Sequence, residues 1–436
     1  MVHEVEIQSQ EKIKEFSFKQ LKKTLQYIES YSPFYKRLFS ENSIAIGSIN
    51  SFDDLVKIPT TSKSDLQKYN DDFLCVPRSQ IAEWTTTSGT LGTPVSFGLT
   101  KADLERLADN EARSLAITDC SSEDLIQLMV TLDKRFMAGL AYYIGAQKFG
   151  CSTIRVGSGS PGLQIDSIIR FKPSVIIAVP SFLLKVLEYA QLNNYKIADS
   201  TVKKIICIGE PIRNEHLELN NLGLRLRERW PEVKMFSTYA STEMATAITE
   251  CASGCGGHIP PELIHIELLD ETGIPVEKGS PGEVTVTCFG VEGMPLLRYR
   301  TGDICVMNED PCDCGNNTSR LSPVLGRKKQ MIKYKGTTLF PETVYELLNG
   351  LHWIKDYVVI LENNELDIDE LTVLISIDEQ IESDKVNILL EEAFESHLRV
   401  KPAIEIKSAA EIRKIKFPGS SRKPLKLIDK RKNVLP

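Results

Sequence analysis

A segment rich in hydroxyl groups and glycine, residues 84–95, has the composition of a phosphate-binding loop. Its sequence, WTTTSGTLGTPV, places three threonines and a serine directly before Gly89. Glycine lets the backbone turn sharply and approach an anion, and the hydroxyl groups add hydrogen-bond donors. The P-loop pattern GxxxxGK[ST] is absent, because no lysine follows the glycines. An ordinary solvated loop can have the same composition, so the interpretation depends on segments downstream.

Cysteine and histidine gather in two short segments, CASGCGGH at 251–258 and CDC at 312–314. Soft thiolates combined with one imidazole suit a tetrahedral Zn²⁺ ion. The alternative is a set of unligated thiols in two glycine-rich turns. A disulfide framework is not expected in a cytosolic protein. The remaining cysteines are scattered, mostly in apolar runs, and are expected to be buried and inert: Cys75, Cys120, Cys151, Cys207, Cys288 and Cys305.

Length and composition restrict the class of protein. A chain of 436 residues is too long for one core and predicts one large and one small domain. The net charge of −7 argues against broad nucleic-acid binding. The basic C-terminal tail could face nucleic acid or a membrane, or it could serve a small phosphate-bearing ligand, which the acidic remainder of the chain favours. No apolar stretch approaches the roughly 20 residues that cross a bilayer. The charged N-terminus lacks a signal-peptide core, so we expect a cytoplasmic protein that binds no membrane.

The hydrophobic pattern changes along the chain. Residues 10–45 and 101–118 are expected to be helical. Between residues 122 and 212, continuous apolar strands alternate with helices, which predicts a largely parallel sheet covered by helices. From residue 262 onward the pattern is β-rich, and residues 337–436 predict an α+β module. These elements would have to position the chemical groups described above.

Three further segments follow the hydroxyl-rich loop in a fixed order: YASTEM at 239–244, RYRTGD at 298–303 and GRKKQMIKYKG at 326–336. In this order they resemble the core motifs of the adenylate-forming superfamily, which contains the acyl-CoA synthetases. The IGEP sequence at 208–211 and a basic tail ending in KLIDKR narrow the resemblance to the phenylacetate–CoA ligase family. This implies an α/β fold. A large N-terminal domain (1–327) would combine a helix-covered, largely parallel sheet with a β-rich subdomain, and a small mobile α+β domain (328–436) would carry the catalytic lysine.

The resemblance also implies an ATP site. Tyr239 would stack near adenine, Asp303 would accept both ribose hydroxyls, Thr242 would contact the α-phosphate and Glu243 would hold Mg²⁺. Thr93 replaces a lysine usual in the family, which removes one positive charge near the phosphates. Thr242 and Glu243 are also the first two expected catalytic residues. The full set of expected nucleotide contacts is Thr86, Thr87, Ser88, Gly89, Thr90, Gly209, Glu210, Tyr239, Ala240, Ser241, Asp303 and Arg327.

The third expected catalytic residue is a lysine in the tail. Aligned on the aliphatic–Asp–basic ending, Lys423 takes the family position, with Arg422 replacing the usual glycine and Lys426 as the alternative. A lysine there would bridge the attacking carboxylate and the α-phosphate. A solvated basic tail is the other interpretation. In the family, a residue just after the GR pair is the hinge about which the small domain rotates between adenylation and thioester formation. The GRKKQ segment offers Lys328 and Lys329 for this role, and Lys329 aligns better.

Two further sites follow from the family. The acyl pocket would be lined by Phe136, Tyr142 and Tyr143, and aromatic walls suit an aryl or arylacetyl group, although aromatics at helical spacing also occur in cores. Some relatives contain a zinc site whose first cysteine lies seven positions before the histidine. That spacing selects four ligands, Cys251, His258, Cys312 and Cys314, with Cys255 as a substitute. Four protein ligands leave no position for substrate, which implies a structural role.

The function implied is activation of a carboxylic acid by ATP to acyl-AMP, followed by transfer to a thiol, with CoA as the expected co-substrate. A rival reaction delivers the acyl group to an amine or a carrier protein. A rival of another class is a non-catalytic scaffold that binds nucleotide or acyl groups. Mg²⁺ and structural Zn²⁺ are the expected cofactors, no nucleic acid is an expected partner, and a homodimer is possible because relatives commonly dimerise.

Overall fold

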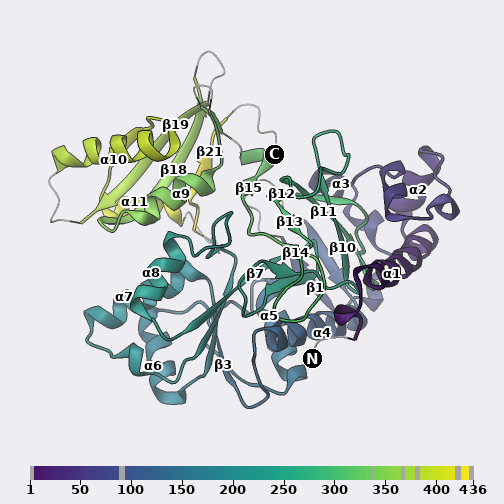
Figure 1. Cartoon of the computed structure of the whole chain (residues 1–436), viewed down its shortest axis with the longest axis horizontal. Coiled ribbons are helices and arrows are strands. Elements are labelled where there is room, and N and C mark those ends of the chain that lie inside the picture. The colour runs from purple at the N-terminus through teal and green to yellow at the C-terminus, as the bar shows by residue number, and fades with distance from the viewer. Residues whose placement is uncertain are drawn as a thin grey trace. The chain divides into compact units, whose positions relative to one another are not determined.

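The computed structural model describes residues 4–87, 94–330, 332–334, 337–364, 369–378, 383–417 and 424–431. The chain divides into two compact units (Figure 1). The first consists of residues 1–87, 94–219 and 223–324, and the second is formed mainly by residues 325–436. Each unit has its own buried apolar clusters. Within the described residues, no helix has the length and hydropathy required to cross a lipid bilayer.

The first unit is built around a nine-stranded sheet in the order β13-β14-β9-β8-β7-β6-β5-β3-β4. Its parallel part consists of β3 (Leu125–Leu128), β4 (Ser152–Arg155), β5 (Val175–Ala178), β6 (Lys204–Ile208) and β7 (Lys234–Ser241). These strands confirm the expected alternation of strand and helix. Its antiparallel part consists of β8 (Thr246–Glu250), β9 (Gly257–His258), β13 (Met307–Asn308) and β14 (Arg320–Leu321). Strand β7 belongs to both parts, because it runs parallel to β6 and antiparallel to β8.

Helices of the first unit begin and end at recognisable signals. Helix α4 (Lys101–Ile117) starts with a capping box in which Thr100 and Asp103 bond reciprocally. Helix α5 ends at Gly150, whose φ of 95° few other residues would adopt. Proline occupies the first turn of α6 and α7. The helices that follow the sheet strands are α4 (Lys101–Ile117), α5 (Met137–Phe149), α6 (Pro161–Phe171), α7 (Pro180–Leu192) and α8 (Asn221–Arg229).

The N-terminal helical region is divided where a single helical stretch was expected. Helix α1 (Gln10–Tyr31) ends at Ser32, whose side chain caps α2 (Pro33–Glu41). Proline at the first position of α2 cannot continue the preceding helix, which explains the division. A short helix, α3 (Lys63–Lys68), and a hairpin of β1 (Glu83–Thr86) and β2 (Ser96–Leu99) follow.

A second sheet in the first unit is antiparallel, as the β-rich pattern predicted. It contains β10 (Ile264–Leu269), β11 (Gly282–Cys288) and β12 (Tyr299–Cys305). The guanidinium of Arg298, just before β12, donates to both carboxylate oxygens of Glu267 at 3.0 and 2.9 Å. Both side chains are buried. This buried ion pair holds the start of β12, which carries the RTGD segment, in place. Breaking such a pair is strongly destabilising because it leaves an uncompensated buried charge.

The second unit is the expected α+β module. Its main sheet has the order β20-β19-β18-β21, and Val359, Leu371 and Phe394 belong to the core on one side of it. Its strands are β15 (Gly326–Arg327), β16 (Ile332–Tyr334), β17 (Thr337–Leu339), β18 (Ile354–Asn363), β19 (Asp369–Ile377), β20 (Ala403–Ile406) and β21 (Leu427–Asp429). Its helices are α9 (Pro341–Gly350), α10 (Ser383–Leu398) and α11 (Ala409–Lys416) (Figure 1).

Candidate nucleotide site and candidate metal centre

Two predicted nucleotide contacts from different sheets meet in the first unit. The Tyr239 hydroxyl, at the end of β7, donates a hydrogen bond of 2.8 Å to Oδ2 of Asp303 on β12. Asp303 is 6% exposed, and its backbone N–H donates to the Thr301 hydroxyl. Burial and the negative charge of Asp303 both raise the pKa of Tyr239, so the phenol stays protonated and remains a donor. The YASTEM and RTGD segments therefore converge.

Glu243 lies in the turn that follows β7. Burial raises the pKa of its carboxyl, and the charge of Asp303 raises it further, whereas Lys63 lowers it. The Ser241 hydroxyl accepts a hydrogen bond of 3.2 Å from the backbone N–H of Met244 and so stabilises the turn. The negative charges of Glu243 and Asp303 therefore repel each other. A cation bound between the phosphates of a ligand and Glu243 would reduce this repulsion. Thr242, between Ser241 and Glu243, is half-buried in the same turn.

Two residues at this site carry no sequence motif. Lys63, at the first position of α3, is close enough to favour the charged form of Glu243. Arg106 of α4 is 7% exposed and donates to the backbone oxygens of Ala245 and Phe289 at 2.5 and 2.7 Å. It thereby joins the turn after Glu243, in which Ala245 has a φ of 47°, to the second sheet. Only the folded chain reveals these roles, because neither residue has distinctive neighbours in the sequence.

The described part of the hydroxyl-rich loop is anchored at both ends. The Thr85 hydroxyl and the Thr86 backbone N–H both donate to the carbonyl oxygen of Arg135, at 2.8 and 3.1 Å. The Thr87 hydroxyl accepts a 3.0 Å bond from the N–H of Val95, and so closes the base of the loop. Ser88, Gly89, Thr90 and Thr93 lie outside the described residues.

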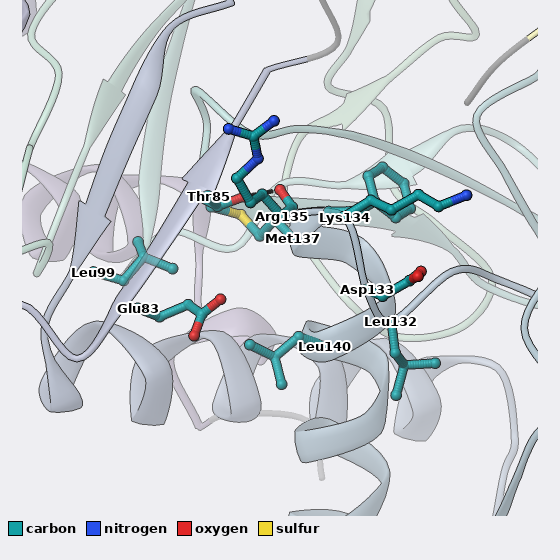
Figure 2. A pocket seen from close by; sticks show the side chains of 10 residues that line it. Glu83, Thr85, Leu99, Leu132, Asp133, Lys134, Arg135, Met137 and Leu140 are labelled. Atoms are coloured by element: carbon teal, nitrogen blue, oxygen red, sulfur yellow. Dashed lines mark hydrogen bonds between the residues drawn. The ribbon is translucent and has the colours of Figure 1, made fainter. Parts of the chain in front are cut away.

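A pocket of about 230 Å³ lies beside the β1–β2 hairpin (Figure 2). Figure 2 shows the Glu83 side chain between those of Leu99 and Leu140. Of the three aromatic residues predicted to form the acyl pocket, Phe136 lines this pocket. The pocket is lined by Glu83, Thr85, Leu99, Leu132, Asp133, Lys134, Arg135, Phe136, Met137 and Leu140.

The other two predicted pocket aromatics lie elsewhere. Tyr142 is 2% exposed and belongs to the apolar cluster under the parallel strands, together with Leu128 and Ile177. Tyr143 is half-buried, and the guanidinium of Arg155 lies 5.1 Å from its ring centre. Neither tyrosine lines the pocket that contains Phe136. Tyr142 is a core residue because helical spacing turns it toward the sheet.

The remaining predicted nucleotide contacts occupy varied positions. Gly209 follows β6 with a φ of 75° and is exposed. The Glu210 carboxylate accepts a 2.9 Å bond from the backbone N–H of Ser181, in the first turn of α7, where a negative charge is favourable. Ala240 is exposed at the end of β7. Arg327, on β15, is exposed in the second unit.

The predicted catalytic lysine, Lys423, and Arg422 before it lie outside the described residues. The alternative, Lys426, extends its ammonium group to 5.7 Å from the centre of the Tyr345 ring within the second unit. Of the two predicted hinge residues, Lys328 lies in a short 3₁₀ turn, Lys328–Gln330, that follows β15. Lys329 belongs to the same turn.

Comparison with known proteins identifies the family. A sequence model described as "AMP-binding enzyme" matches residues 39–291, more than half of the chain. The chain belongs to the AMP-binding enzyme family. It is 28% identical over 381 residues to a phenylacetate-coenzyme A ligase of Thermus thermophilus, covering 86% of this chain and 84% of that protein. It is 25% identical to the Escherichia coli phenylacetate-coenzyme A ligase, covering 86% and 85%.

A solved structure has the same fold as this chain. A crystal structure of 2-hydroxyisobutyryl-CoA ligase superposes with a TM-score of 0.86 at 20% identity, covering 98% of this chain and 91% of that one. These matches confirm the resemblance to the adenylate-forming superfamily and, within it, to the phenylacetate–CoA ligases. They also confirm the predicted fold class and the prediction that the protein is an enzyme.

The predicted metal ligands come together at one point of the first unit. The ligand atoms of Cys251, His258, Cys312 and Cys314 all lie within 4.8 Å of one another. The Sγ atoms of Cys251 and Cys312 are 3.6 Å apart, and Sγ of Cys314 is 3.4 Å from Nε2 of His258. In a tetrahedral site with Zn–S bonds of about 2.3 Å, two sulfur ligands are about 3.8 Å apart. The four side chains therefore fit a zinc ion.

Hydrogen bonds also orient the histidine of this cluster. The Thr318 hydroxyl donates to Oδ1 of Asn316 at 2.7 Å, because the amide group of Asn316 donates to the Glu6 carboxylate. Thr318 Oγ1 must then accept the proton of His258 Nδ1, 3.0 Å away. This leaves the lone pair on Nε2, which faces Cys314. Such outer partners are usual for metal-bound imidazoles.

Proposed function

We propose that the protein is an AMP-forming acid–CoA ligase. In the first half-reaction, a carboxylate oxygen of the substrate forms a bond to the α-phosphorus of ATP, and pyrophosphate leaves. In the second, the sulfur of CoA attacks the acyl carbon and AMP leaves. The observation that carries this proposal is the bond between Tyr239 and Asp303, because it brings the two nucleotide motifs of the family to one place. The similarity to phenylacetate-coenzyme A ligases supports CoA as the acceptor.

Each residue at the site would act through position and charge. Asp303 would accept the ribose hydroxyls, and Tyr239 would hold Asp303 while its ring lies near adenine. Thr242 would donate to the α-phosphate. Glu243 would hold Mg²⁺, which neutralises charge on the phosphates when it is bound. The hydroxyl-rich loop would bind the β- and γ-phosphates.

The second unit would supply the remaining charge. Lys423 would lie between the attacking carboxylate and the α-phosphate, where it offsets the negative charge of both. We keep the domain boundary between residues 327 and 328, with the pivot at Lys328 or Lys329, as part of this proposal. A cytoplasmic location and a homodimer also stay predictions.

The acid would be a small aryl or arylacetic acid. The phenylacetate-coenzyme A ligases to which the chain is similar support this class. The pocket beside the hairpin could receive the acyl group, since Leu132, Phe136 and Leu140 offer an apolar wall. The same pocket is also lined by charged side chains, which would leave an apolar space only for compact acids.

We further propose that the metal centre binds Zn²⁺ in a structural role. Four protein ligands would complete a tetrahedral site and leave no open position. Two of them, Cys251 and His258, adjoin the strands that follow Glu243, and the other two follow β12 and Asp303. The bound ion would therefore hold two parts of the nucleotide site in register.

Pyrophosphate release across a panel of acids tests the reaction. We expect release that depends on ATP and on one class of acid, and CoA should convert the acyl-AMP to a thioester detectable by mass spectrometry. Product formed only with an amine or a carrier protein would reassign the acceptor but keep the adenylation. A complete lack of acid-dependent pyrophosphate exchange would instead support a non-catalytic scaffold.

A further inference from the structure

A buried arginine lies beside the metal centre without a carboxylate partner. Arg320 is on β14, directly opposite His258 of β9 in the antiparallel register, and is only 3% exposed. Its guanidinium donates to the backbone oxygens of Cys255 and Asp310, at 3.1 and 2.7 Å. Among the residues that the structure describes, no carboxylate forms an ion pair with it. Its Nε atom is buried without a hydrogen-bond partner.

A buried guanidinium normally needs a nearby negative charge. Carbonyl oxygens satisfy its hydrogen bonds, but they do not neutralise it, and an uncompensated buried charge is strongly destabilising. Two other buried arginines of this unit do have a negative charge nearby: Arg298 pairs with Glu267, and Arg106 lies close enough to Asp103 for that carboxylate to favour its charged form. The surroundings of Arg320 contain thiols instead. One of its nitrogens lies 2.5 Å from Sγ of Cys255, which in turn is 3.6 Å from Sγ of Cys312.

The loaded metal centre would supply the missing charge. A Zn²⁺ ion bound by three thiolates and one neutral imidazole carries a net charge of −1. We propose that Arg320 is the counter-ion of this centre, and that Cys255 is not a ligand but lies between the guanidinium and the ligand sulfurs. This inference rests on the proposed zinc site and assigns a role to a residue outside the ligand set.

The pairing predicts opposite effects of one substitution in two states of the protein. Methionine replaces the arginine side chain as far as Nε and carries no charge. In zinc-loaded protein, Arg320→Met removes the compensating charge, so the ion should bind more weakly. In metal-free protein, the same change removes a buried cation that has no partner, so it should be neutral or stabilising. A residue that acted only through packing and hydrogen bonds would change both states in the same direction.

Zinc affinity, measured by competition with a chromophoric chelator, gives the direct test. For Arg320→Met we expect affinity to fall roughly 10–100-fold, as for other outer-shell partners of bound metals. Arg320→Lys keeps the charge and should recover most of the affinity. Arg225→Met provides a control, because Arg225 is partly buried and pairs with Glu188 on α7; its zinc affinity should equal that of the wild type.

Melting temperatures with zinc and after chelation complete the test. We expect the increase caused by zinc to be smaller in Arg320→Met than in the wild type, and metal-free Arg320→Met to melt at the temperature of the metal-free wild type or above it. Equal zinc affinities of wild type and Arg320→Met, or an equal fall in both melting temperatures, would overturn the inference. If Arg320→Met does not fold, Arg320→Lys decides alone: a loss of affinity above tenfold would refute a role for charge. Wild-type protein that bound no zinc would refute the metal centre itself, which is a different result.

Discussion

The hydroxyl of Tyr239 lies 2.8 Å from a carboxylate oxygen of Asp303, and this bond joins the end of β7 to β12. One strand belongs to the nine-stranded sheet and the other to the second sheet. The bond therefore controls where the proposed ribose-binding carboxylate points.

Removing this bond should weaken nucleotide binding. In Tyr239→Phe the ring remains but Asp303 loses its donor, and a hydrogen bond to a charged group contributes about 1.5–3 kcal/mol. We expect KM for ATP to rise roughly tenfold in a pyrophosphate-exchange assay. Tyr27→Phe is the matched control, since the Tyr27 hydroxyl bonds to a backbone oxygen at Glu292. If the two variants had equal KM values, the positioning role of Tyr239 would be wrong.

Lys63 should support the reaction through its charge near Glu243. Lys63→Met removes one cation from the site, and a single partly exposed charge is worth roughly 1 kcal/mol, or about fivefold in rate or affinity. We expect kcat/KM for ATP to fall by this factor and the loss to shrink at high salt. Lys68→Met changes the last residue of the same helix and should have no effect. A loss in the control as large as in Lys63→Met would point to damage to α3.

The two lysines of the tail can be separated by parallel substitution. Lys423→Ala should lower adenylation roughly 10²–10³-fold, as expected for loss of a group that stabilises developing charge, while ATP still binds. Lys426→Ala should mainly disturb the contact with Tyr345. Single-turnover formation of acyl-AMP measures both. The opposite ranking would transfer the catalytic role to Lys426.

Zinc should be bound in stoichiometric amount and should stabilise the first unit. Cys312→Ser removes a central ligand, and we expect loss of the metal in elemental analysis and a melting temperature lower by roughly 5–10 °C. Cys120→Ser is the control, because Cys120 is buried outside the cluster and bonds to the Thr118 hydroxyl. Retention of zinc by Cys312→Ser would exclude the proposed ligand set.

A buried carboxyl on α4 should make stability depend on pH. Burial raises the pKa of Glu111 from 4.5 to about 8, and its Oε2 atom has no hydrogen-bond partner. Between these values the folded state binds more protons than the unfolded state, so stability falls as pH rises, by at most about 1.4 kcal/mol per pH unit. The loss is complete above pH 8.

Urea unfolding between pH 5 and 8 checks this dependence. Glu111→Gln keeps the shape and cannot ionise, so its unfolding midpoint should change less with pH than that of the wild type. Glu105→Gln alters an exposed position of the same helix and should leave the wild-type slope in place. Equal slopes for Glu111→Gln and the wild type would assign the pH dependence to other groups.

Much of the fold and of the candidate site was predictable because motifs and periodicity are local. The alternating apolar runs predicted the parallel strands. The resemblance to the zinc site of some relatives selected Cys251, His258, Cys312 and Cys314, which the structure brings together. The division between α1 and α2 also had a local signal in the Ser32–Pro33 pair.

Other features depended on tertiary packing. Lys63 and Arg106 are ordinary charged residues until folding places them beside the turn that carries Glu243. The aromatic pattern around residue 142 fits a pocket wall and a core equally well, and only the packing against Leu128 and Ile177 decides for Tyr142. Helical periodicity indicates that a face is buried, but it does not indicate what covers that face.

The link between Glu6 and Asn316 spans 310 positions of the chain. During synthesis at roughly 5–20 residues per second, the amino-terminal turn would leave the ribosome about 15–60 s before its partner. The turn cannot take its final place until the cysteine-bearing loop has also emerged. Docking of the amino-terminal turn onto this loop is therefore a late event in biogenesis, and the first-made residues of the enzyme are among the last to be secured.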